Sequence, residues 1–318
     1  MAALGAERLA ALLMELGEAD RAVRKRLVLA LAERGGPAGL VRAVDRRLSA
    51  LVNSYGDISW EKTKAYAAEI DGLRTAITQS LAPLDAAAAA ERLARLIGLA
   101  PAVLARVDDS YGRFDDIFRL AVADLGAVWA MIEDRDPERL AEATLSLIQS
   151  DAYGHCDDLI EHATPALGAA GLAALARRAR AVIADLEAGP QHGGDVSRLR
   201  LFHVLSDVAD ARGDVDGFIA VQKARGDFVD TLGVASRLIE VGRAADALAW
   251  LDKPDARPGP LRASQWAHQM LVTAALDQLG RRAEAQAVRW RLFEQSLDRD
   301  VLRAYRSRSR PTKLGESR

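Results

Sequence analysis

Cysteine is nearly absent from this sequence, and aromatic residues are scarce. The chain of 318 residues has a single cysteine, Cys156, which excludes an internal disulfide framework and fits a reducing compartment. Half of the residues are hydrophobic but only 5% are aromatic, so the core must consist mainly of Ala and Leu. Since Ala and Leu favour helices whereas aromatic and β-branched residues favour strands, this composition predicts an all-α fold.

The sequence also lacks an excess of charge of one sign and a long apolar run. A formal net charge of -2 produces no strong field that would attract nucleic acid or an acidic ligand. No uninterrupted apolar run approaches the ~20 residues that span a bilayer. Charges at Glu7, Arg8, Glu15 and Glu18 interrupt the segment where the core of a signal peptide would lie. We therefore expect a cytoplasmic protein that has no membrane partner.

The local patterns that identify common enzyme classes are missing as well. The sequence has no Gly-x-x-x-x-Gly-Lys-Ser/Thr phosphate loop, no His-Glu-x-x-His zinc motif and no Gly-x-Ser-x-Gly nucleophile motif. A Gly-x-Gly-x-x-Gly motif after an expected strand is also missing. The 45 acidic residues are enough to cover exposed helix faces, so pairs of carboxylates do not by themselves indicate catalysis. We expect no enzymatic activity, no cofactor and no small-molecule substrate.

A Tyr-Gly-x-x-Asp-Asp motif occurs twice, 42 residues apart. The shift superimposes Tyr111 on Tyr153 and Gly112 on Gly154, and the acidic and apolar residues that follow coincide too. These further pairs are Asp115/Asp157, Asp116/Asp158, Ile117/Leu159, Phe118/Ile160, Ala121/Ala163 and Leu125/Leu167. A period in the low forties is typical of stacked helix pairs, because one pair cannot bury its apolar face alone. The repeat predicts an irregular α-solenoid of stacked antiparallel helix pairs, similar to HEAT or tetratricopeptide arrays.

Neither copy of the motif has the spacing of a calcium loop. An EF-hand needs oxygen ligands at positions 1, 3 and 5, glycine at position 6 and glutamate at position 12. Counting from Asp108 puts Gly112 at position 5, and counting from Asp151 puts Tyr153 at position 3. We therefore interpret the motif as structural. In this interpretation glycine makes the turn, tyrosine packs between helices, and the aspartates cap or complement the next helix.

The second copy contains a local cluster of metal-type ligands, namely His155, Cys156, Asp157, Asp158 and His162. If both histidines are helical, their spacing of seven puts them on nearly the same face. The first copy has Arg113, Phe114 and Arg119 in the corresponding places, and structural zinc wants four ligands. The sequence therefore leaves two interpretations open: this cluster binds a metal ion, or its residues lie together without one. For the cysteine we expect a buried or half-buried thiol, since the adjacent aspartates oppose its ionisation.

A Gly-rich stretch at 189–194 divides the expected helices into two sections. We predict an N-terminal helical-repeat section over 1–187, a C-terminal tetratricopeptide-like section over 196–305 and a basic, disordered tail over 306–318. The C-terminal section has similar turns at Gly213, Gly242 and Gly280. In the last two, an acid follows four residues after the glycine and an alanine five residues after it. This pattern resembles the turn of tetratricopeptide repeats, where glycine bends the chain and alanine lets helices approach closely.

Three kinds of segment carry a resemblance to a known family. They are the Tyr-Gly-x-x-Asp-Asp elements ending in Leu-Gly, the Gly-Arg-Ala-Ala-Asp-Ala segment that leads to Trp250, and the segment around Trp290 and Phe293. Together they resemble an uncharacterised family of bacterial α-helical proteins, and Leu297–Tyr305 resembles its closing helix. The resemblance implies a helical repeat fold with no known activity. Some relatives are associated with a SWIM-type zinc finger, but this chain lacks the cysteines of that motif and the acidic, aromatic ending of the family.

These patterns predict a non-enzymatic scaffold for protein–protein interaction. Stacked helices create an extended concave surface, along which a segment of a partner protein would lie. The alternative is a nucleic-acid-binding accessory protein that uses arginine clusters at 24–26, 46–47 and 177–180 together with the basic tail. Against this alternative, acids balance bases over the chain, and few aromatic residues are available for stacking on bases.

Overall fold

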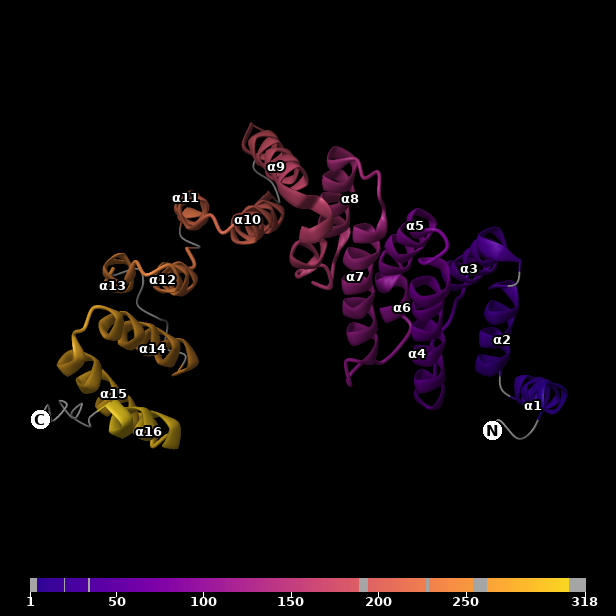
Figure 1. The fold of residues 1–318 in the computed structure, drawn as a ribbon, viewed down its shortest axis with the longest axis horizontal. Helices are drawn as coiled ribbons and strands as arrows, with labels where there is room; N and C mark the ends of the chain where they lie inside the picture. Colours follow the sequence, from indigo (N-terminus) through magenta and orange to yellow (C-terminus); the bar gives the residue numbers. More distant parts are fainter. Residues whose placement is uncertain are drawn as a thin grey trace, which may run out of the picture. The chain divides into compact units, whose positions relative to one another are not determined.

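The computed structural model of the chain describes residues 5–19, 21–33, 35–188, 194–226, 229–253 and 262–308. All the regular secondary structure in these ranges is helical, so the predicted all-α fold is confirmed. The chain divides into two compact units, Met1–Arg212 and Gly213–Arg318. Figure 1 draws the first unit in indigo to salmon and the second in orange to yellow.

In the first unit, the longest helix packs against three of its neighbours. α9 contacts α7, α8 and α10, while α7 also packs against α4 and α5 (Figure 1). The elements are α1 (Ala6–Ala19), α2 (Arg21–Glu33), α3 (Gly36–Val52), α4 (Trp60–Thr75), η2 (Ala76–Leu81), α5 (Ala86–Ile97), α6 (Ala100–Leu104), α7 (Arg113–Met131), α8 (Pro137–Ser150), α9 (Leu159–Ala188) and α10 (Gly194–Ala211).

In the sequence, Asp85 before an alanine-rich run and Asp136 before a proline predict helix starts, and both aspartates do cap helices. The side chain of Asp85 accepts a hydrogen bond from the Ala88 amide at 2.8 Å. Asp136 accepts one from the Glu138 amide at 2.9 Å, with a proline at the first helical position. Such caps satisfy amides that have no partner within the helix. Ser59, which stands before Trp60-Glu61, also has the sequence pattern of a helix cap. The helix α4 does begin after it, but its side chain makes no capping bond.

The helix that begins at Trp60 changes its hydrogen bonding after Thr75. From Ala76 to Leu81 it is a π-helix, and the Ala82 amide donates to the Ile77 carbonyl at 2.9 Å. The Thr78 hydroxyl donates to the carbonyls of Arg74 and Thr75, at 3.0 and 3.2 Å. A hydroxyl that bonds to helix carbonyls in this way competes with the backbone ladder. The sequence predicts one helix from about Trp60 to about Leu81. Its end is confirmed, whereas the π-turn was not predicted.

The sequence predicts a break between two helices at Gly168 and Gly171, and α9 bends at the first of these glycines. Gly168 has φ 55° and ψ -171°, a conformation outside the helical region that glycine can adopt. Gly171, expected to contribute to the same break, instead stays helical and buried. By length and composition α9 could cross a membrane, but more than half of its most apolar window is buried inside the protein. Such burial is found in helices that form the core of a folded unit.

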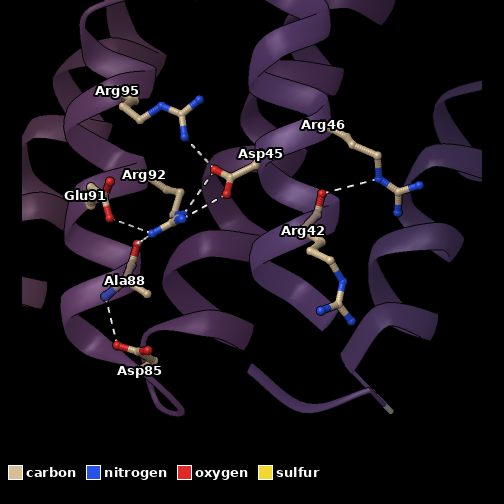
Figure 2. A network of polar contacts seen from close by, with 8 residues as sticks. All are labelled: Arg42, Asp45, Arg46, Asp85, Ala88, Glu91, Arg92 and Arg95. Atoms are coloured by element: carbon tan, nitrogen blue, oxygen red, sulfur yellow. Dashed lines mark hydrogen bonds and ion pairs between the residues drawn. The ribbon is translucent and has the colours of Figure 1, made fainter. Parts of the chain in front are cut away.

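A polar network joins α3 to α5 (Figure 2). The carboxylate of Asp45 accepts hydrogen bonds from Arg92 at 2.9 and 3.2 Å and from Arg95 at 2.5 Å. The hydrogen bond from Arg92, together with the positive charges of both arginines, holds the pKa of Asp45 below its usual value. Figure 2 shows Arg42 and Arg46 directed away from this carboxylate. The network fixes one helix against the other through charges that are only partly exposed.

In the second unit, helices that follow each other in the chain pack together. The elements are α11 (Val215–Ala224), α12 (Thr231–Glu240), α13 (Ala244–Leu251), α14 (Arg262–Gln278), α15 (Arg282–Ser296) and α16 (Arg299–Arg308). Its turns begin at the predicted glycines: Gly213, Gly242 and Gly280 have φ of 64°, 79° and 71°. The alanines five residues after the last two, Ala247 and Ala285, are completely buried. Small side chains there allow close helix packing, as the turn pattern predicts.

The division into units differs from the predicted sections. The structure divides the chain between Arg212 and Gly213, because α10 packs against α9. We expected a boundary between 187 and 196, where residues 189–193 lie outside the described ranges. At the other end, α16 continues to Arg308, so residues 306–308 are helical although they were predicted to belong to the tail. The rest of the predicted tail, 309–318, lies outside the described residues.

Candidate functional site

Each copy of the Tyr-Gly motif forms a turn that precedes a helix, α7 after the first copy and α9 after the second. Gly112 has φ 66° and Gly154 has φ 78°, both in the left-handed region that favours glycine. The apolar residues that follow are buried in both copies: Ile117, Phe118, Ala121 and Leu125 in the first, and Leu159, Ile160, Ala163 and Leu167 in the second. Positions 42 residues apart therefore agree in the glycine conformation and in the burial of the core residues, although α7 begins directly after Gly112 and α9 begins only at Leu159.

In each turn, the aspartate that stands two residues before the tyrosine accepts hydrogen bonds from backbone amides further along the chain. Asp109 accepts hydrogen bonds from the amides of Phe114 and Asp115, at 3.1 and 3.0 Å. Asp151 accepts one from the Cys156 amide at 2.8 Å. Phe114 and Cys156 are themselves 42 residues apart, and both are buried. The paired aspartates after the glycine were expected to cap or complement the next helix. Asp115 and Asp116 lie in the first turn of α7, where their charges complement the helix N-terminus, but Asp109 provides the cap.

The paired aspartates after the glycine contact other side chains or solvent. Asp115 forms an ion pair with Arg119 at 2.9 Å, and its other oxygen lies 3.1 Å from Nε2 of His155 in the second copy. Asp116, Asp157 and Asp158 are exposed. The acids of the first copy occupy the first turn of α7, whereas those of the second copy precede α9. The contact between Asp115 and His155 therefore brings the two copies together.

The tyrosines were expected to pack between helices, and this prediction is wrong. Tyr111 is 74% exposed and Tyr153 is 50% exposed. The guanidinium of Arg113 lies 5.6 Å from the ring centre of Tyr111, and the ring of Tyr153 lies 5.8 Å from that of His155. The turn presents its aromatic ring outward because the buried positions are taken by the residues after the glycine.

The residues considered for a metal site do not converge on one point. His155 is 2% exposed, and its Nδ1 lies 3.7 Å from Asp151. Burial, and then the nearby Asp151 and Asp157, raise the pKa of the Cys156 thiol to about 12. The thiol therefore stays protonated at neutral pH, the form that is neither nucleophile nor metal ligand. Among the described residues, no group of three or more His, Cys, Asp or Glu side chains is placed to hold a metal ion.

The first turn borders a cavity of about 420 Å³ that the sequence did not predict. We call it the Trp60–Tyr111 pocket, and its lining consists of Trp60, Glu61, Thr63, Lys64, Asp108, Asp109, Tyr111 and Arg113. Trp60, the first residue of α4, is 71% exposed. Two large aromatic side chains thus stand open to solvent on one cavity. Large exposed aromatic residues that share a hollow are typical of binding surfaces.

Contacts between two loops hold this pocket in shape. The Ile58 amide donates to the Arg106 carbonyl at 2.8 Å, and Nε of Arg106 donates to the Gly56 carbonyl at 2.9 Å. The guanidinium of Arg106 lies 5.7 Å from the ring centre of Tyr66, which in turn packs near Phe114. These bonds join the loop before Trp60 to the loop before Tyr111. The pocket is therefore supported by backbone bonds as well as by its own side chains.

The second turn borders a different cavity, of about 490 Å³, against α10. Its lining is more polar and includes Asp157, Asp158, Arg200 and His203. Arg200 donates to the carbonyls of Ile148 and Gln149, at 3.2 and 3.1 Å, so it completes the end of α8. The two copies of the motif therefore share their turn but face different surroundings, and the first copy has the more aromatic cavity.

Removing either of these two carboxylates should destabilise the first unit to a similar extent. We expect Asp109→Ala and Asp151→Ala each to lower the free energy of unfolding by about 1–2 kcal/mol, because Asp109 caps α7 and Asp151 accepts a hydrogen bond from the amide of the buried Cys156 in the turn. Asp116→Ala is the matched control, for which a loss of only about 0.3–0.5 kcal/mol is expected from the helix dipole. Urea denaturation followed by circular dichroism measures all three. A larger loss for the control than for either of the other two variants would contradict the assignment.

The comparisons with known proteins identify a family and add no activity. No curated protein and no solved structure matches the chain. A family model described as a family of unknown function, DUF6880, matches residues 1–310. Since the match covers nearly the whole chain, the predicted resemblance to a domain of unknown function is confirmed. The chain belongs to the DUF6880 family of unknown function.

Proposed function

We propose that this chain is a non-enzymatic helical scaffold that binds a protein partner through the Trp60–Tyr111 pocket. The observation that carries the proposal is the exposure of Trp60 and Tyr111, 71% and 74%, on one cavity. Tryptophan and tyrosine are enriched among the residues that dominate protein–protein binding energies. A side chain of the partner would cover both rings and remove their apolar surface from water.

The charges around the pocket suit a polypeptide ligand. Lys64 and Arg113 supply positive charge, and Glu61, Asp108 and Asp109 supply negative charge. Interfaces commonly have an apolar centre inside a polar rim, where hydrogen bonds fix the orientation of the partner. A rim of both signs favours a partner segment that carries groups of both signs as well. It does not favour a strongly acidic or strongly basic polymer.

We further infer that the helix pairs of each unit form irregular α-solenoid arrays, with tetratricopeptide-like turns in the second unit. The equivalent turns 42 residues apart support this inference in the first unit. In the second unit, support comes from Arg243–Asp246 and Arg281–Glu284, ion pairs at the same place in two successive turns. We place the protein in the cytoplasm, where its single protonated thiol would stay reduced.

Nucleic-acid binding is less well supported, because several of the clustered basic side chains already form ion pairs with acidic side chains. Lys25 and Arg47 both form ion pairs with Glu69. Arg177 and Arg178 both pair with Glu138, and Arg178 also lies 3.4 Å from Glu142. Cations that already have acidic partners release fewer counterions from a phosphate backbone. We therefore treat nucleic-acid binding as an outcome to be tested alongside protein binding.

The proposal predicts that losing both aromatic rings will abolish capture of the partner. Tagged wild-type protein, the Trp60→Ala/Tyr111→Ala double variant and Tyr153→Ala would be compared in pull-downs from the source organism. The Tyr153 variant is the matched control, because it loses the exposed tyrosine of the equivalent turn. Two lost anchors should weaken affinity for the purified partner by roughly 100-fold, measured by calorimetry, while the control binds like wild type.

Two results would count against the proposal. One is recovery of the same proteins, with unchanged affinity, by the double variant. The other is a set of captured proteins that disappears after nuclease treatment, together with salt-dependent binding of purified DNA or RNA, which would favour the nucleic-acid alternative. Thermal denaturation of each variant shows whether it is folded. Because both replaced aromatic side chains are mostly exposed, we expect their removal to change stability little.

A further inference from the structure

The second unit contains a cavity of about 530 Å³ between α14, α15 and α16. We call it the α14–α16 cavity. Its volume falls within the range of small-molecule sites, roughly 300–1,000 Å³. It is a partly open groove on these helices, and a hollow of this size is a candidate for a ligand.

The walls of this cavity are mainly apolar. α14 contributes Trp266 and Met270, α15 contributes Leu292, and α16 contributes Val301 and Ala304. Met270 is 45% exposed although it lies on a cavity wall, so the cavity is open to solvent on that side. An apolar body that filled the cavity would cover the indole of Trp266 and the thioether of Met270. Both side chains offer apolar surface to a ligand, and the methionine can also change its conformation to fit one.

A buried arginine forms the polar part of the wall. Arg289 on α15 is 6% exposed, and it pairs with Asp277 and donates to the side-chain oxygen of Gln286 at 2.8 Å. Burial lowers the pKa of its guanidinium, which already has an acid to neutralise it. An anionic ligand would have to compete with Asp277 for this guanidinium. The buried pair therefore does not make the cavity a receptor for anions.

The rim of the cavity carries an excess of negative charge. Asp298 and Asp300 line it together with Asp277, while Arg289 is the cation among the lining residues. Asp300 pairs with Arg303. Asp298 accepts hydrogen bonds from the amides of Asp300 and Val301, at 2.7 and 3.2 Å, and no ion pair of Asp298 is found within the described residues. Its carboxylate is thus available to a cation at the edge of the cavity.

We propose that the α14–α16 cavity binds a small organic cation with an apolar body and one ammonium or guanidinium group. The apolar body lies against Trp266, Met270 and Leu292, and the cation pairs with Asp298 at the rim. The combination selects against two other classes. Anionic amphiphiles meet the carboxylate of Asp298, and strongly polar cations gain nothing from the apolar walls. This site lies within the second unit and does not depend on the protein-binding role proposed for the Trp60–Tyr111 pocket.

Three ligands with the same body and different charge test the proposal on the full-length protein. We would titrate 3-phenylpropylamine, 3-phenylpropanol and 3-phenylpropanoate and follow binding by calorimetry and amide chemical shifts. The amine should bind with a dissociation constant on the order of 1 mM or tighter, as for a fragment of this size. It should bind roughly tenfold more tightly than the alcohol, and the carboxylate should bind most weakly.

Two variants separate the charge from the apolar wall. Asp298→Asn keeps a side-chain oxygen to cap α16 but removes the charge, so the preference for amine over alcohol should disappear. Ala304→Leu fills the cavity from α16 and should abolish binding of both ligands. An unchanged preference in the asparagine variant would overturn the proposal, as would equal binding of the three ligands or shifts confined to the first unit. If the leucine variant fails to fold, the asparagine variant still decides the question.

Discussion

Replacing Gly126 with alanine should lower the free energy of unfolding of the first unit by about 3 kcal/mol. Gly126 is buried in α7, where α9 crosses it. A Cβ at this position would lie 2.5 Å from the carbonyl oxygen of His162 and 2.6 Å from its carbonyl carbon. Both atoms belong to the backbone of α9, so the clash cannot be relieved by rotating a side chain. The two helices would have to separate, and the packing around them would loosen.

Gly98→Ala is the matched control for this variant. Gly98 follows α5 with φ -63°, and the atoms nearest to an added Cβ are carbonyl oxygens at 3.6 Å. We expect its free energy of unfolding to change by no more than about 0.5 kcal/mol, since alanine fits this backbone. Chemical denaturation measured by circular dichroism distinguishes the two variants. Equal stability of both would mean that α7 and α9 do not approach as closely as described.

Removing the carboxylate of Asp45 should have the second largest effect, a loss of about 2 kcal/mol in the free energy of unfolding. Its carboxylate bonds to Arg92 and Arg95 of α5, and the side chain of Arg92 is only 11% exposed (Figure 2). Asp45→Ala therefore leaves a largely buried guanidinium with Glu91 as its remaining acidic partner in the network. Losing one member of a partly buried pair costs more than losing an exposed one.

The contribution of Asp45 should also depend on pH in a definite direction. The hydrogen bond from Arg92 lowers the pKa of Asp45 in the folded protein below its unfolded value. Its contribution is thus complete above the unfolded pKa, roughly 4, and is lost as the pH falls through the folded pKa. The stability difference between wild type and Asp45→Asn should be constant near neutral pH and shrink below about pH 4. A stability difference that stays constant as the pH falls below about 4 would contradict the network.

The features that the sequence predicted well depend on residues close together in the chain. Asp85 and Asp136 start helices because each caps an amide two or three residues away. The 42-residue register was visible because each copy contains both the turn glycine and the spacing of its buried residues. Local steric and hydrogen-bonding preferences of this kind are present in a short segment before any tertiary contact forms.

The features that were missed depend on segments far apart in the chain. The Trp60–Tyr111 pocket exists because Arg106 joins a loop some fifty residues earlier, and no local pattern contains that contact. The exposure of Tyr111 follows from the same arrangement, since Phe114 takes the buried position against Tyr66. α10 was assigned to the second section because a Gly-rich stretch precedes it. Packing against α9, which periodicity does not reveal, decides its place instead.

The π-turn between α4 and α5 gives the first unit a place where the length of the chain can change. Each hydrogen-bonded ring of a π-turn holds one residue more than a ring of an α-helix. Residues 76–81 thus contain one more residue than α-helical bonding needs, and Gln79 is exposed there while Ile77 and Leu81 are completely buried. Deletion of Gln79 would return the segment to α-helical bonding, and Ile77 and Leu81 would both stay buried. An insertion or deletion elsewhere in α4 would instead rotate the helix about its axis and turn its apolar face away from α7.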